Sequence, residues 1–267
     1  MKDIIKFSLL TIIFALLTSC DKDQTGARFV DGDKGVSFDN AKYKVEIETN
    51  VTYIDFHVSR VSAVSAATIS ITHTSTYHGI ITIPQTVNFA KGEYETTLRI
   101  SIDPGKMDPF GQYVFDLKLE DIASLGGINE TNVTVNLIAP WIENIGYSTL
   151  TSDFYGYTKD LIVTDSLKIG TNIYYRLNNC YYGLEPEIEA GYHIIFMVDE
   201  NDNVSVPFAE QNIGETYYFP DGYLYFRLES AVKAGREITF TVTFALSEAE
   251  EQYYWEFPGY TEVVTLP

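Results

Sequence analysis

The stretch YETTLRISI, residues 94–102, alternates between polar and apolar side chains. In an extended strand, successive side chains point to opposite faces. Leu98, Ile100 and Ile102 would therefore form one apolar row, opposite Arg99. The alternation predicts a β-strand with one buried face and one face in water.

The same alternation recurs before and after this stretch. It predicts further strands at 43–49, 53–60, 67–73, 86–90, 113–121, 131–137, 160–165, 172–178, 192–199, 223–229, 237–246 and 261–266. Short strands rich in Val, Ile, Thr, Tyr and Phe, bounded by Gly, Asn or Pro, are typical of β-sandwiches. We therefore predict an all-β protein of two tandem β-sandwich domains, 35–139 and 140–267. Pro140 marks the boundary, because most tyrosines follow it.

The first domain resembles a known family. The segments that carry the likeness are Val36–Phe38, Thr86–Glu93, Leu98–Ile102 and Phe115–Leu119. They are similar to the Calx-β pattern, which implies an Ig-like sandwich. Some Calx-β domains bind Ca²⁺ through clustered carboxylates, and Ca²⁺ needs six to eight oxygen ligands. Here only Asp103 and Asp108 stand near that position, beside Lys106. We expect a spacer domain without a metal.

The N-terminus has the features of a lipoprotein signal. An apolar run, Phe7–Leu17, follows two lysines and is too short to span a bilayer. The residues after it, Leu17-Thr18-Ser19-Cys20, resemble the bacterial lipobox. The resemblance implies that residues 1–19 are removed and that Cys20 is acylated, so outer-membrane lipid is the first expected partner.

The residues that follow bear on location. Asp21-Lys22-Asp23 resembles the surface-export signal of Bacteroidetes lipoproteins, and residues 20–34 read as a flexible tether. In the second domain, Gly146–Ser148, Asp153-Phe154 and Tyr175–Asn178 are similar to a module found at the C-terminus of many surface lipoproteins of these bacteria. We expect a lipid-anchored protein on the outer membrane that faces the exterior.

Composition excludes some partners. The chain has 18 basic and 37 acidic residues, for a formal net charge of −19. Nucleic acid and anionic membrane surfaces bind basic footprints, so neither is expected to be a partner. With Cys20 acylated, Cys180 has no cysteine to pair with, and a buried apolar role is predicted for it.

No catalytic or cofactor motif stands out. The sequence lacks HExxH, CxxC, GxSxG and a phosphate loop. Residues 198–210 place Asp199, Asn201 and Asn203 at EF-hand-like spacing, but Val204 stands where that loop needs glycine. A β-hairpin turn is predicted there. We expect no cofactor, no metal and no enzymatic activity, with a hydrolase acting through two carboxylates as an alternative.

Tyrosine doublets provide the candidate binding site. In a strand, one member of a doublet faces in and the other faces out. Exposed aromatic rings can stack on sugars or on a partner protein. The candidate ligand-facing aromatics are Tyr181, Tyr182, Tyr217, Tyr218 and Trp255. The sequence favours non-catalytic binding of an extracellular polymer, most simply a glycan. A structural or adhesive subunit that docks a partner protein is the other alternative.

Overall fold

The structure is a computed structural model that describes residues 35–120, 127–183, 190–216, 222–248 and 252–267. Apart from one short 3-10 turn, η2 (Pro104–Lys106), the elements in these ranges are all β-strands. The all-β prediction is confirmed. None of the helical residues within these ranges forms a segment long and apolar enough to cross a membrane.

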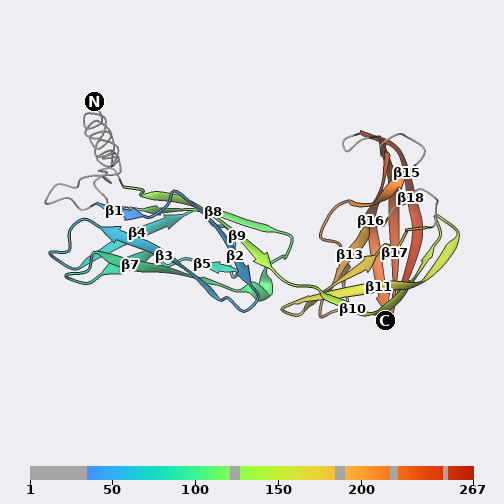
Figure 1. Ribbon diagram of the computed structural model, residues 1–267, viewed down its shortest axis with the longest axis horizontal. Coiled ribbons are helices and arrows are strands. Elements are labelled where there is room, and N and C mark those ends of the chain that lie inside the picture. The colour runs from blue at the N-terminus through green and yellow to red at the C-terminus, as the bar shows by residue number, and fades with distance from the viewer. Residues whose placement is uncertain (1–34, 121–126, 184–189, 217–221, 249–251) are drawn as a thin grey trace, which may run out of the picture.

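The N-terminal half is a β-sandwich, drawn in blue to green in Figure 1. Its described strands are β1 (Val36–Phe38), β2 (Lys42–Glu48), β3 (Tyr53–Arg60), β4 (Ala67–His73), β5 (Ile81–Thr82), β6 (Thr86–Phe89), β7 (Glu95–Ile102), β8 (Gln112–Leu119) and β9 (Glu130–Ile138). They form one sheet in the order β1-β3-β7-β5 and another in the order β2-β9-β8-β4-β6. The pair β2–β9 is parallel and the other pairs are antiparallel.

The sandwich core comes from the inward row of each strand. In β7, Leu98, Ile100 and Ile102 are buried while Arg99 is exposed, so the alternation at 94–102 is confirmed. Phe115 of β8 is 1% exposed and packs into the same core cluster. Removing such side chains from water is the main force that holds the two sheets together.

The C-terminal half is one curled sheet, drawn in yellow to red in Figure 1. Its described strands are β10 (Ile142–Ser152), β11 (Tyr157–Ile169), β12 (Asn172–Asn178), β13 (His193–Val198), β14 (Val204–Ser205), β15 (Gln211–Thr216), β16 (Gly222–Ala234), β17 (Glu237–Glu248) and β18 (Gln252–Thr265). Their order is β14-β13-β12-β11-β10-β18-β17-β16-β15, and every described pair is antiparallel.

This sheet curls until its two ends approach each other, so a single sheet supplies both layers around the core. The side chain of Gln211 on β15 joins the ends: its Oε1 accepts from the N–H of Ile195 at 2.7 Å, and its Nε2 donates to the Ile195 carbonyl at 2.8 Å. The core is strongly aromatic. Phe240 lies between Phe196, at a centroid distance of 5.3 Å, and Phe226, at 6.0 Å.

The two halves meet at an aromatic junction. Phe110, which precedes β8, lies 5.8 Å from Tyr174 of β12 and 5.1 Å from Phe208, measured between ring centroids. Trp141, which precedes β10, lies 6.5 Å from Phe110. The β11–β12 turn approaches so closely that a Cβ on Gly170 would overlap the Gly105 carbonyl. Glycine is therefore required at this contact, where Gly170 also has a φ of 58°.

Candidate functional site

One outward face of the curled sheet carries a row of threonines. Direct cross-strand neighbours on this face are Thr151 with Thr158, Thr151 with Val263, and Thr241 with Thr261. We call this surface the threonine face; its members are Thr149, Thr151, Thr158, Thr239, Thr241, Thr261 and Val263. Side chains that oppose each other across two strands, or lie two positions apart on one strand, share a face. The threonine face is therefore a surface of closely spaced hydroxyls.

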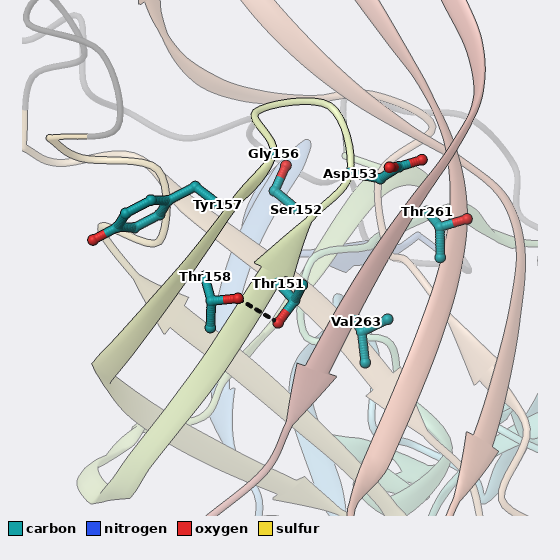
Figure 2. A pocket seen from close by; sticks show the side chains of 8 residues that line it. All are labelled: Thr151, Ser152, Asp153, Gly156, Tyr157, Thr158, Thr261 and Val263. Carbon is teal, nitrogen blue, oxygen red and sulfur yellow. Dashed lines mark hydrogen bonds between the residues drawn. The ribbon is translucent and has the colours of Figure 1, made fainter.

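A shallow groove of about 500 Å³ opens at one end of the threonine face (Figure 2). Its lining comes from β10, β11, β18 and the turn between the first two: Thr151, Ser152, Asp153, Gly156, Tyr157, Thr158, Thr261 and Val263. Figure 2 shows the hydroxyls of Thr151 and Thr158 directed at each other, 3.0 Å apart. The groove thus combines hydroxyls, one carboxylate and one half-exposed tyrosine ring.

The β10–β11 turn forms the wall of this groove. Gly156 has a φ of 61°, a left-handed conformation that glycine adopts without strain. The N–H of Asp153 donates to the Thr261 carbonyl at 3.0 Å and ties the turn to β18. The ring of Phe154 stacks on Phe244 at 4.4 Å and anchors the turn in the core. The wall is therefore held both by a backbone hydrogen bond and by aromatic packing.

A buried carboxyl group lies beneath the groove. Glu262 of β18 is 0% exposed, and its neighbours in the chain both line the groove. It accepts hydrogen bonds from Ser152 Oγ at 2.7 Å and from Tyr181 Oη at 3.1 Å. Burial raises the pKa of Glu262 to about 7, although these hydrogen bonds act in the opposite direction.

The predicted ligand-facing aromatics are not brought together as one platform. Tyr181 is 1% exposed, so its prediction is wrong. β12 ends at Asn178, and the doublet lies in the turn after it, where the Tyr181 ring turns inward against Tyr155 and Phe244. The expectation for a tyrosine doublet is only that one member is buried and the other exposed, and here Tyr182 is the exposed member.

Two of the other aromatics remain at the surface. Tyr182 is 52% exposed, and the Lys159 ammonium lies 5.6 Å from its ring centroid. Trp255 on β18 is 53% exposed. Tyr217, Tyr218 and the proposed acylation site Cys20 lie outside the described residues. Their roles stay predictions.

The sequence contains a signal for the threonine face. The segment STLTS, 148–152, is not among the predicted strands, yet it forms the end of β10. Its hydroxyl residues resemble a loop in composition. Its two threonines, however, are spaced by two residues, and the same spacing holds for Thr239, Thr241 and Thr243 on β17. Period-two threonines in several strands are the pattern that predicts such a face.

Two smaller predictions are confirmed. Residues 199–203 form a hairpin turn, since Val198 pairs with Val204 and the Asp199 carboxylate accepts from the N–H groups of Asn201 and Asn203, both at 2.8 Å. Cys180 is a buried free thiol. Within the described ranges, His, Cys, Asp and Glu side chains form no group of three or more placed to hold a metal ion.

Comparison with known proteins gives similarities of fold. No family model matches the chain, and no curated protein matches it. A multidomain protein from Bacteroides ovatus has a TM-score of 0.38 and 9% identity, covering 87% of this chain and 93% of that one. An auxiliary nutrient binding protein from Bacteroides thetaiotaomicron has a TM-score of 0.35 and 12% identity, covering 85% and 89%.

Another likeness covers a smaller part of the chain. The apo-form Calx CBD1 domain has a TM-score of 0.32 and 14% identity, covering 39% of this chain and 96% of that domain. All of these identities are low.

Proposed function

We propose that this protein is a lipid-anchored, non-catalytic binding protein of the cell surface, and that its threonine face and groove bind an uncharged polysaccharide. The observation that carries the proposal is the array of neighbouring hydroxyls on β10, β11, β17 and β18. The N-terminal sandwich acts as the spacer, and the acyl chains on Cys20 hold the protein at the outer membrane.

The chemistry of the face favours this ligand. A polysaccharide presents a regular series of hydroxyls, and threonine hydroxyls both donate and accept hydrogen bonds. Hydroxyls of the protein spaced by the sheet, about 4.8 Å across strands and about 6.8 Å along them, can contact consecutive sugars. The net charge of −19 disfavours polyanionic glycans. Tyr157, 54% exposed at the groove, offers a ring for stacking.

Affinity electrophoresis through gels that contain a panel of neutral polysaccharides tests the proposal. At least one should retard the wild type. The double variant Thr151→Val, Thr261→Val keeps the shape of both side chains but removes two groove hydroxyls, and should weaken retardation by about ten-fold or more. Thr86→Val, at an exposed position of β6, is the matched control and should migrate as wild type.

Two results would count against the proposal. One is a wild type that migrates freely through every gel. The other is equal retardation of the double variant and the wild type. Trp255→Ala and Tyr182→Ala in the same gels show whether the aromatics predicted from the sequence add to the binding surface.

The anchor has its own experiment. Cells that express the full chain should incorporate radiolabelled palmitate into the wild type and not into Cys20→Ser. Equal labelling of both proteins would remove the anchor from the proposal without touching the binding face.

A second candidate function is an adhesive subunit that docks a partner protein. Beside the threonine face, β10 and β11 expose apolar side chains, with Tyr147 54%, Leu161 73% and Val163 36% exposed. Tyr147 and Val163 are direct cross-strand neighbours. Contiguous exposed apolar area is a feature of protein interfaces. Crosslinking on intact cells should join the protein to one dominant neighbour, and Leu161→Asp should abolish this crosslink. The absence of a dominant crosslinked protein would disfavour this function.

A further inference from the structure

The groove is connected to the protein interior through one residue. Ser152 is among the residues that line the groove, but it is only 2% exposed, and its side-chain oxygen lies 2.7 Å from the buried Glu262 Oε1. The same oxygen accepts the N–H of Tyr155 at 3.2 Å. The backbone of Phe154 also acts to lower the pKa of Glu262. The groove wall is thus linked to Glu262 through Ser152, which accepts the N–H of Tyr155.

A serine hydroxyl has one hydrogen to donate. While Glu262 is ionised, its carboxylate can only accept, so Ser152 donates that hydrogen inward to Oε1. No hydrogen of Ser152 is then left for a ligand in the groove. A neutral carboxylic acid carries its own O–H donor, which can donate to Ser152 and leave the serine hydrogen available to a ligand.

We propose that Glu262 is a positioning residue for the groove: its protonation turns the Ser152 hydroxyl from the interior toward the ligand. The acid O–H on Oε1 then donates to Ser152 Oγ, and Ser152 donates into the groove. The proton comes from solvent, and no covalent bond between heavy atoms forms or breaks. This inference rests on the proposed polysaccharide-binding function of the same groove.

Oε1 is the oxygen that carries the proton in this scheme, because Tyr181 donates to Oε2 and keeps that oxygen an acceptor. The contact with Ser152, at 2.7 Å, is shorter than the 3.1 Å contact between Oε2 and Tyr181 Oη. Burial and the nearby carboxylate raise the pKa of Tyr181 well above its usual value, so its phenol stays protonated and continues to donate to Oε2. Of the two partners, Ser152 is the one that also lines the groove.

The surroundings place this change near neutral pH. Burial raises the pKa of Glu262 to about 7. The Lys159 ammonium donates to the carbonyls of Asn179 and Tyr182 at 2.7 and 2.6 Å. The titratable groups that interact with the carboxyl are Asp153, Cys180 and Tyr181; Tyr155 lies beside Tyr181, and Lys159 interacts with Cys180. The residue directly opposite Glu262 on β17 is Phe240, which is apolar.

Nuclear magnetic resonance tests the switch without a ligand. The amide resonances of Phe154 and Tyr155 should shift between pH 5.5 and 8.5 with a midpoint near 7. In Glu262→Gln, which stays neutral, they should stay constant over this range. Glu237→Gln, an exposed glutamate of β17, is the matched control and should titrate as wild type. Constant amide shifts in the wild type, or the same titration in Glu262→Gln, would overturn the inference.

Binding at two pH values tests the connection to the ligand. A neutral polysaccharide that retards the wild type should bind about three- to ten-fold more tightly at pH 6 than at pH 8, the effect of one additional hydrogen bond. Glu262→Gln and Ser152→Ala should each remove this difference. A pH dependence that survives both substitutions overturns the inference while leaving the proposed function intact. If no polysaccharide binds, the proposed function fails, and the amide titration alone decides the role of Glu262.

Discussion

Each half of the molecule contains an aspartate–arginine pair formed by directly opposed residues of antiparallel strands. Asp55 of β3 faces Arg99 of β7 in the sandwich, and Asp165 of β11 faces Arg176 of β12 in the curled sheet. In both pairs the arginine donates through Nε and Nη2. The first pair has side chains that are 37% and 57% exposed, and the second has 4% and 24%. The local chemistry is the same, and the exposure to water differs.

The comparison shows what burial demands. Asp165 accepts two further hydrogen bonds, from the N–H of Asn144 at 2.8 Å and from Asn178 Nδ2 at 2.7 Å. Burial raises its pKa, but these hydrogen bonds and Arg176 outweigh burial and lower it. For Asp55 the hydrogen bond from Arg99 is the largest cause of a lowered pKa. A buried charge needs a complete set of partners, whereas an exposed one has water.

The contrast extends to the whole of both halves. Among the described residues, the buried polar side chains of the sandwich are Arg60 and Thr131, and those of the curled sheet are Ser148, Ser152, Thr164, Asp165, Gln211, Ser247 and Glu262. Polar groups inside a core cost free energy and are concentrated where function or specificity requires them. This distribution agrees with a spacer in the N-terminal half and a binding site in the C-terminal half.

Removing the buried aspartate should have the largest effect. Asp165→Ala leaves Arg176 in a mostly buried position without its carboxylate and deprives Asn144 and Asn178 of a partner. We expect a loss of about 3–5 kcal/mol in the free energy of unfolding. Urea denaturation, monitored by circular dichroism, measures this loss. A loss below about 1 kcal/mol would mean that burial does not distinguish the two pairs.

Neutralising Glu262 should stabilise the protein at alkaline pH. Its folded pKa of about 7 lies above the ordinary value of 4.5, so its favourable contribution is complete below pH 4.5 and disappears as pH rises through 7. The wild type should lose about 3 kcal/mol over this range from Glu262 alone. Glu262→Gln should be more stable than the wild type at pH 8 by up to that amount, measured by urea denaturation at each pH. If Glu262→Gln is less stable than the wild type at pH 8, the carboxylate is not destabilised by burial.

Removing the exposed aspartate should have the smallest effect. Asp55→Ala breaks a pair whose partners both reach water, and Arg99 keeps its contact with the Tyr53 ring, 3.9 Å from its centroid. The melting temperature should stay within about 2 °C of the wild type. A drop comparable to that of Asp165→Ala would show that the sandwich depends on its surface charges.

The sequence predicted most of the fold, because strand alternation is a local property. Leu98, Ile100 and Ile102 reached the core as the period-two pattern required. It did not predict the burial of Tyr181, because the turn after β12 ends the alternation before that residue. The strand predicted at 261–266 places Glu262 in the row of Val264 and Leu266, but it could not show the partner Ser152, which lies 110 positions away in the chain.

Hydrogen–deuterium exchange of the full chain, with and without a neutral polysaccharide that retards it, tests the central claim most directly. If the curled sheet carries the binding site, added polysaccharide should slow exchange in peptides that cover 147–158 and 259–265 and leave those within 36–138 unchanged. Slowed exchange confined to 36–138 would contradict the account, because the sandwich would then be the binding unit and the curled sheet the spacer.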